Sequence, residues 1–219
     1  MDIGVFDIVG PVMVGPSSSH TAGAVHLGQS ARMLYGDLPR EVTILLHGSF
    51  AATYRGHRTD IALVAGLLGM SSADPQIKDA LEIAEDHSMN IHICKEDLGE
   101  VHPNTARFLF HDNTTLREIT GCSTGGGSIE ITSINGFMVK WTGKHPALFT
   151  SHLDSPGVIA KVTGSLAKAG INIATMQVIR KVRGADALLF VETDSVVPQQ
   201  VVDEIRTIPD IYWVRHTNC

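Results

Sequence analysis

The fold is most directly predicted from residues 147–160, which read ALFTSHLDSPGVIA. The segment from Ala147 to Leu153 predicts a strand, and Asp154-Ser155-Pro156-Gly157 predicts a turn that leads into a helix. Apolar residues at helical spacing mark the buried face of this helix, namely Val158, Ile159, Val162 and Leu166. Gly170 ends the helix, because glycine readily adopts the left-handed conformation that follows a helix C-terminus.

Two strands, a second helix and a last strand follow this helix. They are predicted at residues 171–182, 185–194, 198–205 and 211–216. Arg183-Gly184 forms the hinge between the two strands, and Val201, Val202 and Ile205 form the inward face of the second helix. The order βαββαβ is the ferredoxin-like pattern, so we expect residues 147–219 to form one domain of this type.

Residues 1–143 predict a domain that mixes helices and strands. Helices are expected to start near His20 or Thr21, near Ile61 and at the Asp74-Pro75 cap, with a strand at residues 41–46 between the first two. The segment YRGHRTD, residues 54–60, is expected to be a loop. Residues 1–10 alternate weakly and fit either a short strand or a helix.

From Asn90 to Thr142 the apolar period changes to two residues, which is typical of strands. Asn113 and Asn135-Gly136 supply turns, so we expect an antiparallel meander, interrupted by the corner GCSTGGGS at residues 121–128. Helices followed by hairpin-linked strands favour an α+β domain with an antiparallel sheet. A linker to the second domain is predicted at residues 142–146.

The polar stretch GPVMVGPSSSHTAGA, residues 10–24, precedes the first helix. Its two Gly-Pro steps stiffen the backbone, and the helix start presents unpaired N–H groups and the positive end of a dipole. Three serines and a histidine add hydroxyls and an imidazole, which suits a small anion such as a carboxylate. The alternative is a serine-rich cap that only starts the helix.

Composition narrows the classes of function. The net charge is −6 and no block of lysine or arginine occurs, which disfavours a nucleic-acid partner. No apolar run approaches the roughly 20 residues of a membrane span, and no basic-then-apolar leader is present, so we expect a cytoplasmic protein without a membrane partner. Cys94, Cys122 and Cys219 match neither a disulfide framework nor a metal or cluster ligand set, so no metal site is expected in this chain.

Residues 147 to about 217 resemble an ACT domain, a small regulatory module that often binds amino acids. The turn LDSPG at residues 153–157 and the run GINIATM at residues 170–176 carry the resemblance, in the matching order of elements. A lone ferredoxin-like sheet leaves strand edges open, and such edges are usually paired or covered, so we expect two copies of this domain to associate. If the domain senses an amino acid, the effector site is expected beside that interface, at Asp154, Ser155, Gly157 and Asn172. A cation site, or a domain that only pairs with its own copy, is the alternative.

Residues 1 to about 143 resemble the β chain of the iron–sulfur-dependent L-serine dehydratase. Four motifs carry this resemblance: GPSSSHTAGA at residues 15–24, HGSFAATYRGHRTD at 47–60, HPNT at 102–105 and STGGG at 123–127. Tyr54 and Arg58 depart from the second motif, where smaller residues are expected. In this family the cluster cysteines lie on a separate α chain or a fused α domain, which agrees with their absence here.

The resemblance implies an L-serine ammonia-lyase that converts L-serine to pyruvate and ammonia, in amino-acid degradation and gluconeogenesis. The chain would be active only in a heteromer with an α chain that holds a [4Fe–4S] cluster, whose open iron acts as a Lewis acid on the substrate hydroxyl. This chain would hold the substrate carboxylate, orient Cα and supply a base.

The motifs supply the candidate site residues. Catalytic roles are expected for His57, Asp60 and His20, with Asp60 close enough in sequence to fix the tautomer of His57. Substrate contacts are expected from Ser17, Ser18, Ser19, Thr21, His102 and Asn104. The structural alternatives are an N-terminal cap for Asp60 and an Asx-type loop around Asn104.

Two features remain open between a functional and a structural reading. Residues 123–127 fit either a nest of backbone N–H groups or a tight hairpin corner. No lysine follows at the P-loop spacing, so a nucleotide-binding site is excluded. His92 and Cys94 share one strand face and could touch a metal, although two ligands without a third are more often a buried pair.

A stand-alone amino-acid-sensing protein with no catalysis is the alternative function. The ACT-like segment and the absence of a complete catalytic set support it. The three polar motifs SSSHT, GHRTD and HPN favour the dehydratase subunit, because a pure sensor would not need them.

Overall fold

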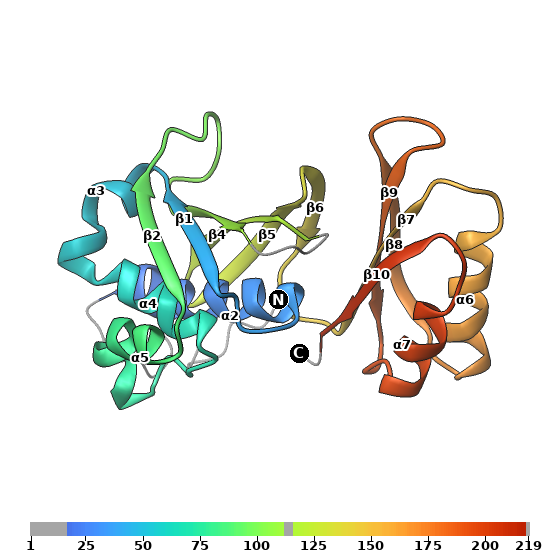
Figure 1. Cartoon of the computed structure of the whole chain (residues 1–219), viewed down its shortest axis with the longest axis horizontal. Coiled ribbons are helices and arrows are strands. Elements are labelled where there is room, and N and C mark those ends of the chain that lie inside the picture. The colour runs from blue at the N-terminus through green and yellow to red at the C-terminus, as the bar shows by residue number, and fades with distance from the viewer. Residues whose placement is uncertain (1–16, 112–115, 218–219) are drawn as a thin grey trace. The chain divides into compact units, whose positions relative to one another are not determined.

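The chain divides into two compact units, and the division falls within residues 137–143 (Figure 1). The computed structural model describes residues 17–111 and 116–217. The element predicted at residues 1–10, the Gly15-Pro16 step, the Asn113 turn and Cys219 therefore lie outside the described residues. Within the described part, none of the helices is both long and apolar enough to cross a membrane.

Among the described residues of the first unit, the first element is a π-helical turn, η1 (Ser18–Ala22), that runs directly into α2 (Gly23–Tyr35). The hydroxyl of Ser17 caps this start by accepting a hydrogen bond from the His20 N–H at 3.3 Å, as the serine-rich sequence predicts. Gly36, with φ 96°, ends α2 in the left-handed conformation. The buried face of α2 includes Leu27, Ala31 and Leu34.

Six strands form the sheet of the first unit in the order β2-β1-β3-β4-β5-β6. They are β1 (Glu41–Leu46), β2 (Asn90–Lys95), β3 (Thr105–Phe110), β4 (Glu118–Gly125), β5 (Ser128–Ile134) and β6 (Phe137–Trp141). The neighbouring pairs β1–β3, β3–β4 and β4–β5 are antiparallel, as expected. β2 instead pairs parallel with β1, with Asn90 opposite Glu41, which corrects the prediction that Asn90 begins the meander. A parallel neighbour needs a long crossover, and the helices between β1 and β2 provide it.

Two helices follow β1, whereas the sequence predicted a loop at residues 54–60 and then one helix near Ile61. They are α3 (Gly48–His57) and α4 (Thr59–Leu67), separated by the left-handed residue Arg58 with φ 55°. The polar segment from Tyr54 onward was therefore wrongly predicted as a loop. α3 buries fully only Phe50, so its sequence shows no apolar stripe, and tertiary contacts rather than periodicity establish the helix.

The crossover ends with η2 (Pro75–Asp79) and α5 (Ala80–Asp86). Asp74 caps η2 by accepting a hydrogen bond from the Gln76 N–H at 2.9 Å, which confirms the predicted cap. The strand that follows presents His92 and Cys94 to solvent, so these residues are not a buried pair. In the described residues, no three histidine, cysteine or acidic side chains are grouped closely enough to hold a metal ion.

The α2 and α4 helices pack with their backbones in contact. A Cβ atom added to Gly28 would clash with the Leu63 carbonyl oxygen, and one added to Gly66 would clash with the Val25 carbonyl oxygen. α4 is consequently buried on nearly all sides rather than on one face, as the run from Ala62 to Leu67 shows. The N-terminal ends of both helices carry residues of the predicted site.

The second unit has the predicted βαββαβ order. Its elements are β7 (Ala147–Leu153), α6 (Val158–Lys168), β8 (Ile173–Arg180), β9 (Asp186–Thr193), α7 (Gln199–Arg206) and β10 (Ile211–His216). The sheet order is β10-β7-β9-β8, with every neighbouring pair antiparallel. Both helices cover one face of this sheet (Figure 1). The ferredoxin-like prediction is confirmed.

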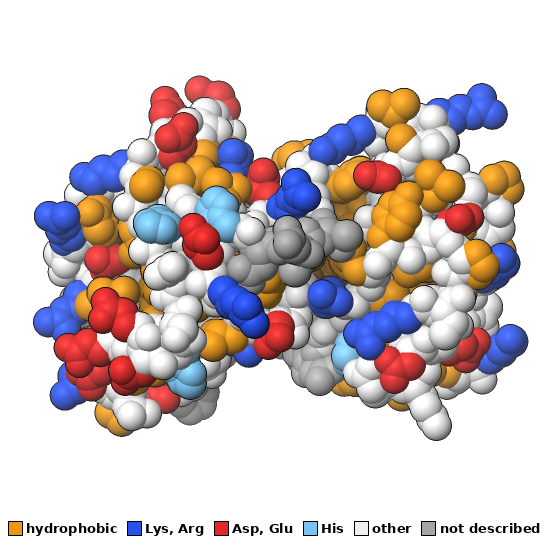
Figure 2. Space-filling model, viewed as in Figure 1, with side chains coloured by type: hydrophobic (Ala, Val, Ile, Leu, Met, Phe, Trp, Pro, Cys, Tyr) orange, Lys and Arg blue, Asp and Glu red, His pale blue; other side chains and the backbone are white. Residues whose placement is uncertain are grey.

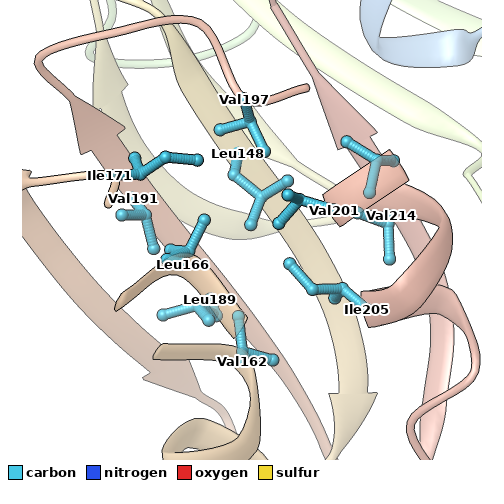
Figure 3. Packing of buried hydrophobic residues seen from close by; sticks show 11 residues of the cluster. Leu148, Val162, Leu166, Ile171, Leu189, Val191, Val197, Val201, Ile205 and Val214 are labelled. Carbon is cyan, nitrogen blue, oxygen red and sulfur yellow. The ribbon is translucent and has the colours of Figure 1, made fainter. Parts of the chain in front are cut away.

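An aliphatic core joins these helices to the sheet. Leu148 and Val191 from the strands meet Leu166 of α6 and Ile205 of α7 (Figure 3). The predicted inward residues Val201 and Val202 are also buried in this cluster, whereas Ile159 is only partly buried against it.

The surface mixes charges of both signs. On the face drawn in Figure 2, lysine and arginine side chains are dispersed among acidic ones. Acidic side chains gather at the loop after β2, where Glu96, Asp97 and Glu100 are exposed (Figure 2). This loop is tied to the second motif, because the Leu98 N–H donates a hydrogen bond to His47 Nδ1 at 3.1 Å.

Candidate functional site

His20 connects the first and second motifs. Its Nδ1 atom lies 3.3 Å from Ser17 Oγ, and its Nε2 atom lies 3.1 Å from Ser49 Oγ at the start of α3. The Phe50 ring meets the His20 ring edge-on, with 5.2 Å between centroids. Both ring nitrogens of His20 therefore face hydroxyl groups, and an aromatic side chain restricts the plane of the ring.

His57 lies beside His20. The centroids of the two rings are 4.8 Å apart and their planes are inclined by 33°. Burial, and secondarily the neighbouring His57, lower the pKa of His20, which favours an uncharged imidazole there at neutral pH. His57, which the sequence predicted in a loop, is the last residue of α3, and the left-handed Arg58 follows it.

Asp60 does not contact His57 in the way the sequence predicted. Its Oδ1 atom accepts a hydrogen bond at 2.9 Å from the N–H of Ile61 in the first turn of α4. Burial raises the pKa of Asp60, partly offset by that N–H and by nearby arginines. His57 Nδ1 is buried and has no hydrogen-bond partner among the described residues. Asp60 therefore satisfies an N–H group in the first turn of α4, whereas the N-cap position belongs to Arg58, which makes no side-chain capping bond.

The third motif supports the start of α3. The Pro103 carbonyl oxygen accepts hydrogen bonds from the N–H groups of Ser49 at 2.8 Å and Phe50 at 3.3 Å. Gly48 adopts φ 55°, and a Cβ there would lie 2.7 Å from the Pro103 carbonyl oxygen, so only glycine fits. In the same motif the Asn104 N–H donates to Nδ1 of the exposed His102 at 3.1 Å.

The fourth motif joins the third and the first. The Ser123 N–H donates to the Asn104 carbonyl at 3.0 Å, and Asn104 Nδ2 donates back to the Ser123 carbonyl at 3.5 Å. The Ser123 side chain occupies the space where a Cβ of Gly23 would lie, at the start of α2. Four motifs that are far apart in the sequence thus converge on one region of the first unit.

The glycine run of the fourth motif is a hairpin corner. Gly125 pairs with Ser128 across the turn, and Gly125, Gly126 and Gly127 all have positive φ. The Gly127 carbonyl oxygen is 2.6 Å from His26 Nδ1 on α2. This arrangement favours the corner over a nest of N–H groups, and it places Gly125 next to the Ser19 hydroxyl.

Four buried polar side-chain atoms lack a hydrogen-bond partner among the described residues. They are Thr21 Oγ1, His57 Nδ1, Thr59 Oγ1 and Ser123 Oγ. Buried polar atoms are usually paired, and each unpaired one costs about 1–3 kcal/mol. All four belong to the predicted motifs, so this polar cost is concentrated at the site, as is typical of a region that binds a polar ligand.

Sequence reasoning missed Ser49 and Thr59 as individual site residues. Ser49 contacts His20 from 29 residues away, and Thr59 is fully buried directly after the left-handed Arg58. Both lie within the second motif, which was the available signal. Ser123 was considered only for its backbone, whereas its unpaired hydroxyl is the notable feature.

The described cysteines do not form a cluster site. Cys94 is exposed on β2, and Cys122 is buried on β4, with β1 and β3 between these strands. Burial, together with nearby Glu130, raises the pKa of the Cys122 thiol to about 11, so it stays protonated at neutral pH. The residues that the structure describes therefore do not fit a [4Fe–4S] cluster, whose ligands are thiolates.

In the second unit, the predicted effector residues already have partners. Asp154 Oδ2 accepts hydrogen bonds from the Gly184 N–H at 3.0 Å and from Arg180 at 2.7 Å, which lower the pKa of this carboxyl. Ser155 donates to Asp210 at 2.7 Å. Asn172 Nδ2 donates to Asp194 Oδ2 at 2.5 Å. Gly157, with φ 92°, is the N-cap of α6.

Comparisons with known proteins identify both units. The family model described as "Serine dehydratase beta chain" matches residues 4–133, which is more than half of the chain, and the ACT domain model matches residues 147–210. The chain belongs to the serine dehydratase β-chain family. A probable L-serine dehydratase β chain of Bacillus subtilis (strain 168) is 47% identical to this family member over 96% of both chains. The L-serine dehydratase β chain of Peptoniphilus asaccharolyticus is 34% identical over 93% of both.

This β-chain family member also resembles part of a differently named enzyme. A D-3-phosphoglycerate dehydrogenase of Synechocystis sp. is 27% identical over 84% of this chain, and the match covers 34% of that protein. The resemblance predicted from the motifs is confirmed by the family matches, including the ACT domain that follows the β-chain segment.

Proposed function

We propose that this chain is the β subunit of an L-serine dehydratase, a lyase that converts L-serine to pyruvate and ammonia together with an α chain. The proposal rests on the convergence of four polar motifs on His20 and His57, where buried polar atoms have no hydrogen-bond partner among the described residues. The names of the B. subtilis and P. asaccharolyticus relatives support it. Because the described residues of this chain do not fit a [4Fe–4S] cluster, the α chain is the proposed holder of that group.

The start of the first helix is the proposed carboxylate site. The hydroxyls of Ser17, Ser18 and Ser19 lie at a helix N-terminus, where N–H groups and the helix dipole favour an anion. Thr21 adds a buried hydroxyl with no partner among the described residues. His102 and Asn104 of the third motif are proposed as a second wall of the substrate site.

His57 is the proposed base for the Cα proton of the substrate. His20 lies 4.8 Å away, centroid to centroid, and its lowered pKa means that it adds no positive charge at neutral pH. A neutral neighbour leaves His57 free to accept a proton without charge repulsion. Asp60, which accepts the Ile61 N–H in the first turn of α4, would act by fixing the backbone that follows His57 and Arg58.

The ACT domain is proposed to bind an amino-acid effector through Asp154, Ser155, Gly157 and Asn172. A ligand there would have to compete with the Asn172–Asp194 and Ser155–Asp210 hydrogen bonds. The ACT domain is also proposed to join two β chains by self-association, because an open sheet edge is usually paired or covered. A cytoplasmic location is proposed for the assembly.

Co-expression with a cysteine-bearing α chain in the absence of oxygen tests this function. The expected product is a brown complex that converts L-serine to pyruvate, whereas the purified β chain alone is colourless and inactive. Turnover by the β chain alone with stoichiometric iron and sulfide would contradict the division of labour. A stable complex without activity on L-serine would contradict the proposed reaction.

A non-catalytic amino-acid sensor is the second candidate. The observation that favours it is the match of 84% of this chain to part of a D-3-phosphoglycerate dehydrogenase, because it places a similar two-domain segment in a protein with another named activity. Calorimetry with L-serine on the β chain, in parallel with the anaerobic assay, distinguishes the two. Binding without activity in any complex would favour the sensor.

A further inference from the structure

The contacts of the His20 ring indicate which of its two nitrogens carries the proton. Ser17 Oγ accepts the backbone N–H of His20 at 3.3 Å and also lies 3.3 Å from Nδ1 of the same residue. An oxygen that already accepts one hydrogen bond is well placed to direct its own O–H toward the Nδ1 lone pair. The proton of neutral His20 then lies on Nε2, which donates to Ser49 Oγ at 3.1 Å.

Ser49 is held rigidly for this contact. Its N–H donates to the Pro103 carbonyl at 2.8 Å, and its carbonyl accepts the Thr53 hydroxyl at 2.8 Å. The preceding Gly48 closely approaches Pro103, which restricts the start of α3. The Ser49 hydroxyl therefore projects from a backbone that is fixed on both sides.

No other described group competes for the orientation of His20. The contacts of its ring are the hydroxyls of Ser17 and Ser49, the edge of Phe50 and the ring of His57. Among the described ion pairs, none involves His20. Its tautomer is therefore determined by two serines, one local in sequence and one on α3.

We propose that Ser49 is a positioning residue that holds His20 in the Nε2–H tautomer and orients its ring beside His57. Ser49 acts through His20 and does not contact the substrate. The Nε2 proton of His20 stays on the side of Ser49. A second proton is taken up at Nδ1, on the side of Ser17. The catalytic part of this inference rests on the proposed dehydratase function.

Nitrogen NMR of the isolated β chain tests the structural part without any activity. The imidazole signals of His20 are assigned by their loss in His20→Gln. The expected wild-type spectrum has one pyrrole-like Nε2 and one pyridine-like Nδ1. In Ser49→Ala the two shifts move toward a common average, since the Nε2–H acceptor is gone. Ser49→Thr keeps a hydroxyl and restores the wild-type pattern.

Thr132→Val is the matched control. It removes a threonine hydroxyl from β5 that donates to the Thr120 carbonyl at 3.3 Å and lies outside the four motifs, and valine has nearly the same shape and is favoured in strands. The His20 shifts are expected to stay unchanged in this variant. Thermal unfolding of all variants checks that each is folded.

The reconstituted enzyme tests the catalytic part. Ser49→Ala is expected to lower kcat about tenfold, a fraction of the 10²–10⁴ that a lost acid or base costs. KM for L-serine stays within about twofold, because Ser49 does not bind substrate. The acid limb of the kcat profile also moves, and Ser49→Thr restores it.

The outcomes separate this inference from the proposed function. Unchanged His20 shifts in folded Ser49→Ala overturn the positioning role, whatever the enzyme activity. Shifted signals with unchanged kcat and pH profile overturn the catalytic part alone. If the wild-type complex has no dehydratase activity, the proposed function fails while the NMR result still decides the tautomer.

Discussion

The two units treat their buried polar groups in opposite ways. In the first unit, Thr21, His57, Thr59 and Ser123 carry buried atoms with no hydrogen-bond partner among the described residues. In the second unit, the buried Ser165 donates to Glu204 at 2.7 Å, the buried Thr193 hydroxyl donates to the Ser195 carbonyl at 2.7 Å, and the buried Thr217 hydroxyl accepts the Ala147 N–H at 2.8 Å. Unpaired buried groups reduce stability, so the first unit retains a cost that the second avoids. This difference favours the first unit as the binding site of a polar ligand, because such a ligand would supply the missing hydrogen bonds.

The largest expected effect is on the first unit. Replacing His57 by Asn in the reconstituted pair should lower kcat for L-serine by about 10²–10⁴, the usual cost of a lost general base. Anaerobic assays measure kcat, and thermal unfolding confirms the fold. His87→Asn, at an exposed position after α5, is the control and should retain full activity. A loss below about tenfold would move the base to another residue.

Stability should change in opposite directions when one hydroxyl is removed from each unit. Ser165→Ala should lower the free energy of unfolding of the second unit by about 1.5–3 kcal/mol, because a hydrogen bond to a carboxylate is lost. Ser123→Ala should raise that of the first unit by about 1 kcal/mol, since an unpaired buried hydroxyl disappears. Amide hydrogen exchange reports each unit separately. Destabilisation of the first unit by Ser123→Ala would show that this hydroxyl has a hydrogen-bond partner. It would contradict the proposed difference between the buried polar groups of the two units.

A smaller effect is expected for Asn172→Ala. If the second unit binds L-serine, losing this amide should weaken binding about fivefold, equivalent to about 1 kcal/mol for one hydrogen bond. Calorimetry on the full chain measures it, and heat that is insensitive to Asn172 belongs to another site. Gln199→Ala removes a similar amide that donates to Asp203 at 2.8 Å and serves as the control. Equal affinities in both variants would remove Asn172 from the effector site.

The smallest expected effects concern the acid dependence of two aspartates. The pKa of Asp154 is lowered by the Gly184 N–H and Arg180, so its contribution to stability is present above pH 3.8 and is lost as pH falls below it. The pKa of Asp60 is raised by burial, so its contribution is present below pH 3.8 and is lost as pH rises through its folded-state pKa. Asp154→Asn should flatten the acid loss of stability of the second unit, and Asp60→Asn should steepen that of the first. Hydrogen exchange between pH 3 and 6 checks both, and equal slopes in the two variants would refute the opposite signs.

The second unit was predictable from sequence because its local signals agree with one another. The Pro156-Gly157 turn, Gly170 at a helix end and the inward faces of both helices each point to the observed elements. In the first unit, α3 and the parallel pairing of β2 could not be read in this way. α3 fully buries a single side chain, and strand direction depends on a crossover rather than on the alternation within the strand.

The same distinction between local and long-range signals applies to the candidate site. Motif residues could be chosen because polar side chains at a helix start have recognisable chemistry, as at Ser17 and His20. The contact between His20 and Ser49 joins residues 29 positions apart, and periodicity contains no information about it. The predicted Asp60–His57 pair was based on closeness in sequence, whereas the left-handed Arg58 separates the two residues onto different helices.

The glycine contact between α2 and α4 has a consequence for how this sequence can evolve. Gly28 and Gly66 let the two helix backbones touch. Thr59 is the first residue of α4, and Thr21 lies in η1, which runs directly into α2. A methyl group at either glycine would push the helices apart and move both hydroxyls with them. A mutation at either glycine is therefore expected to affect the packing of the helices and the geometry of the site together, because the same displacement changes both. Relatives that keep this arrangement of the two helices should therefore keep a glycine at both positions.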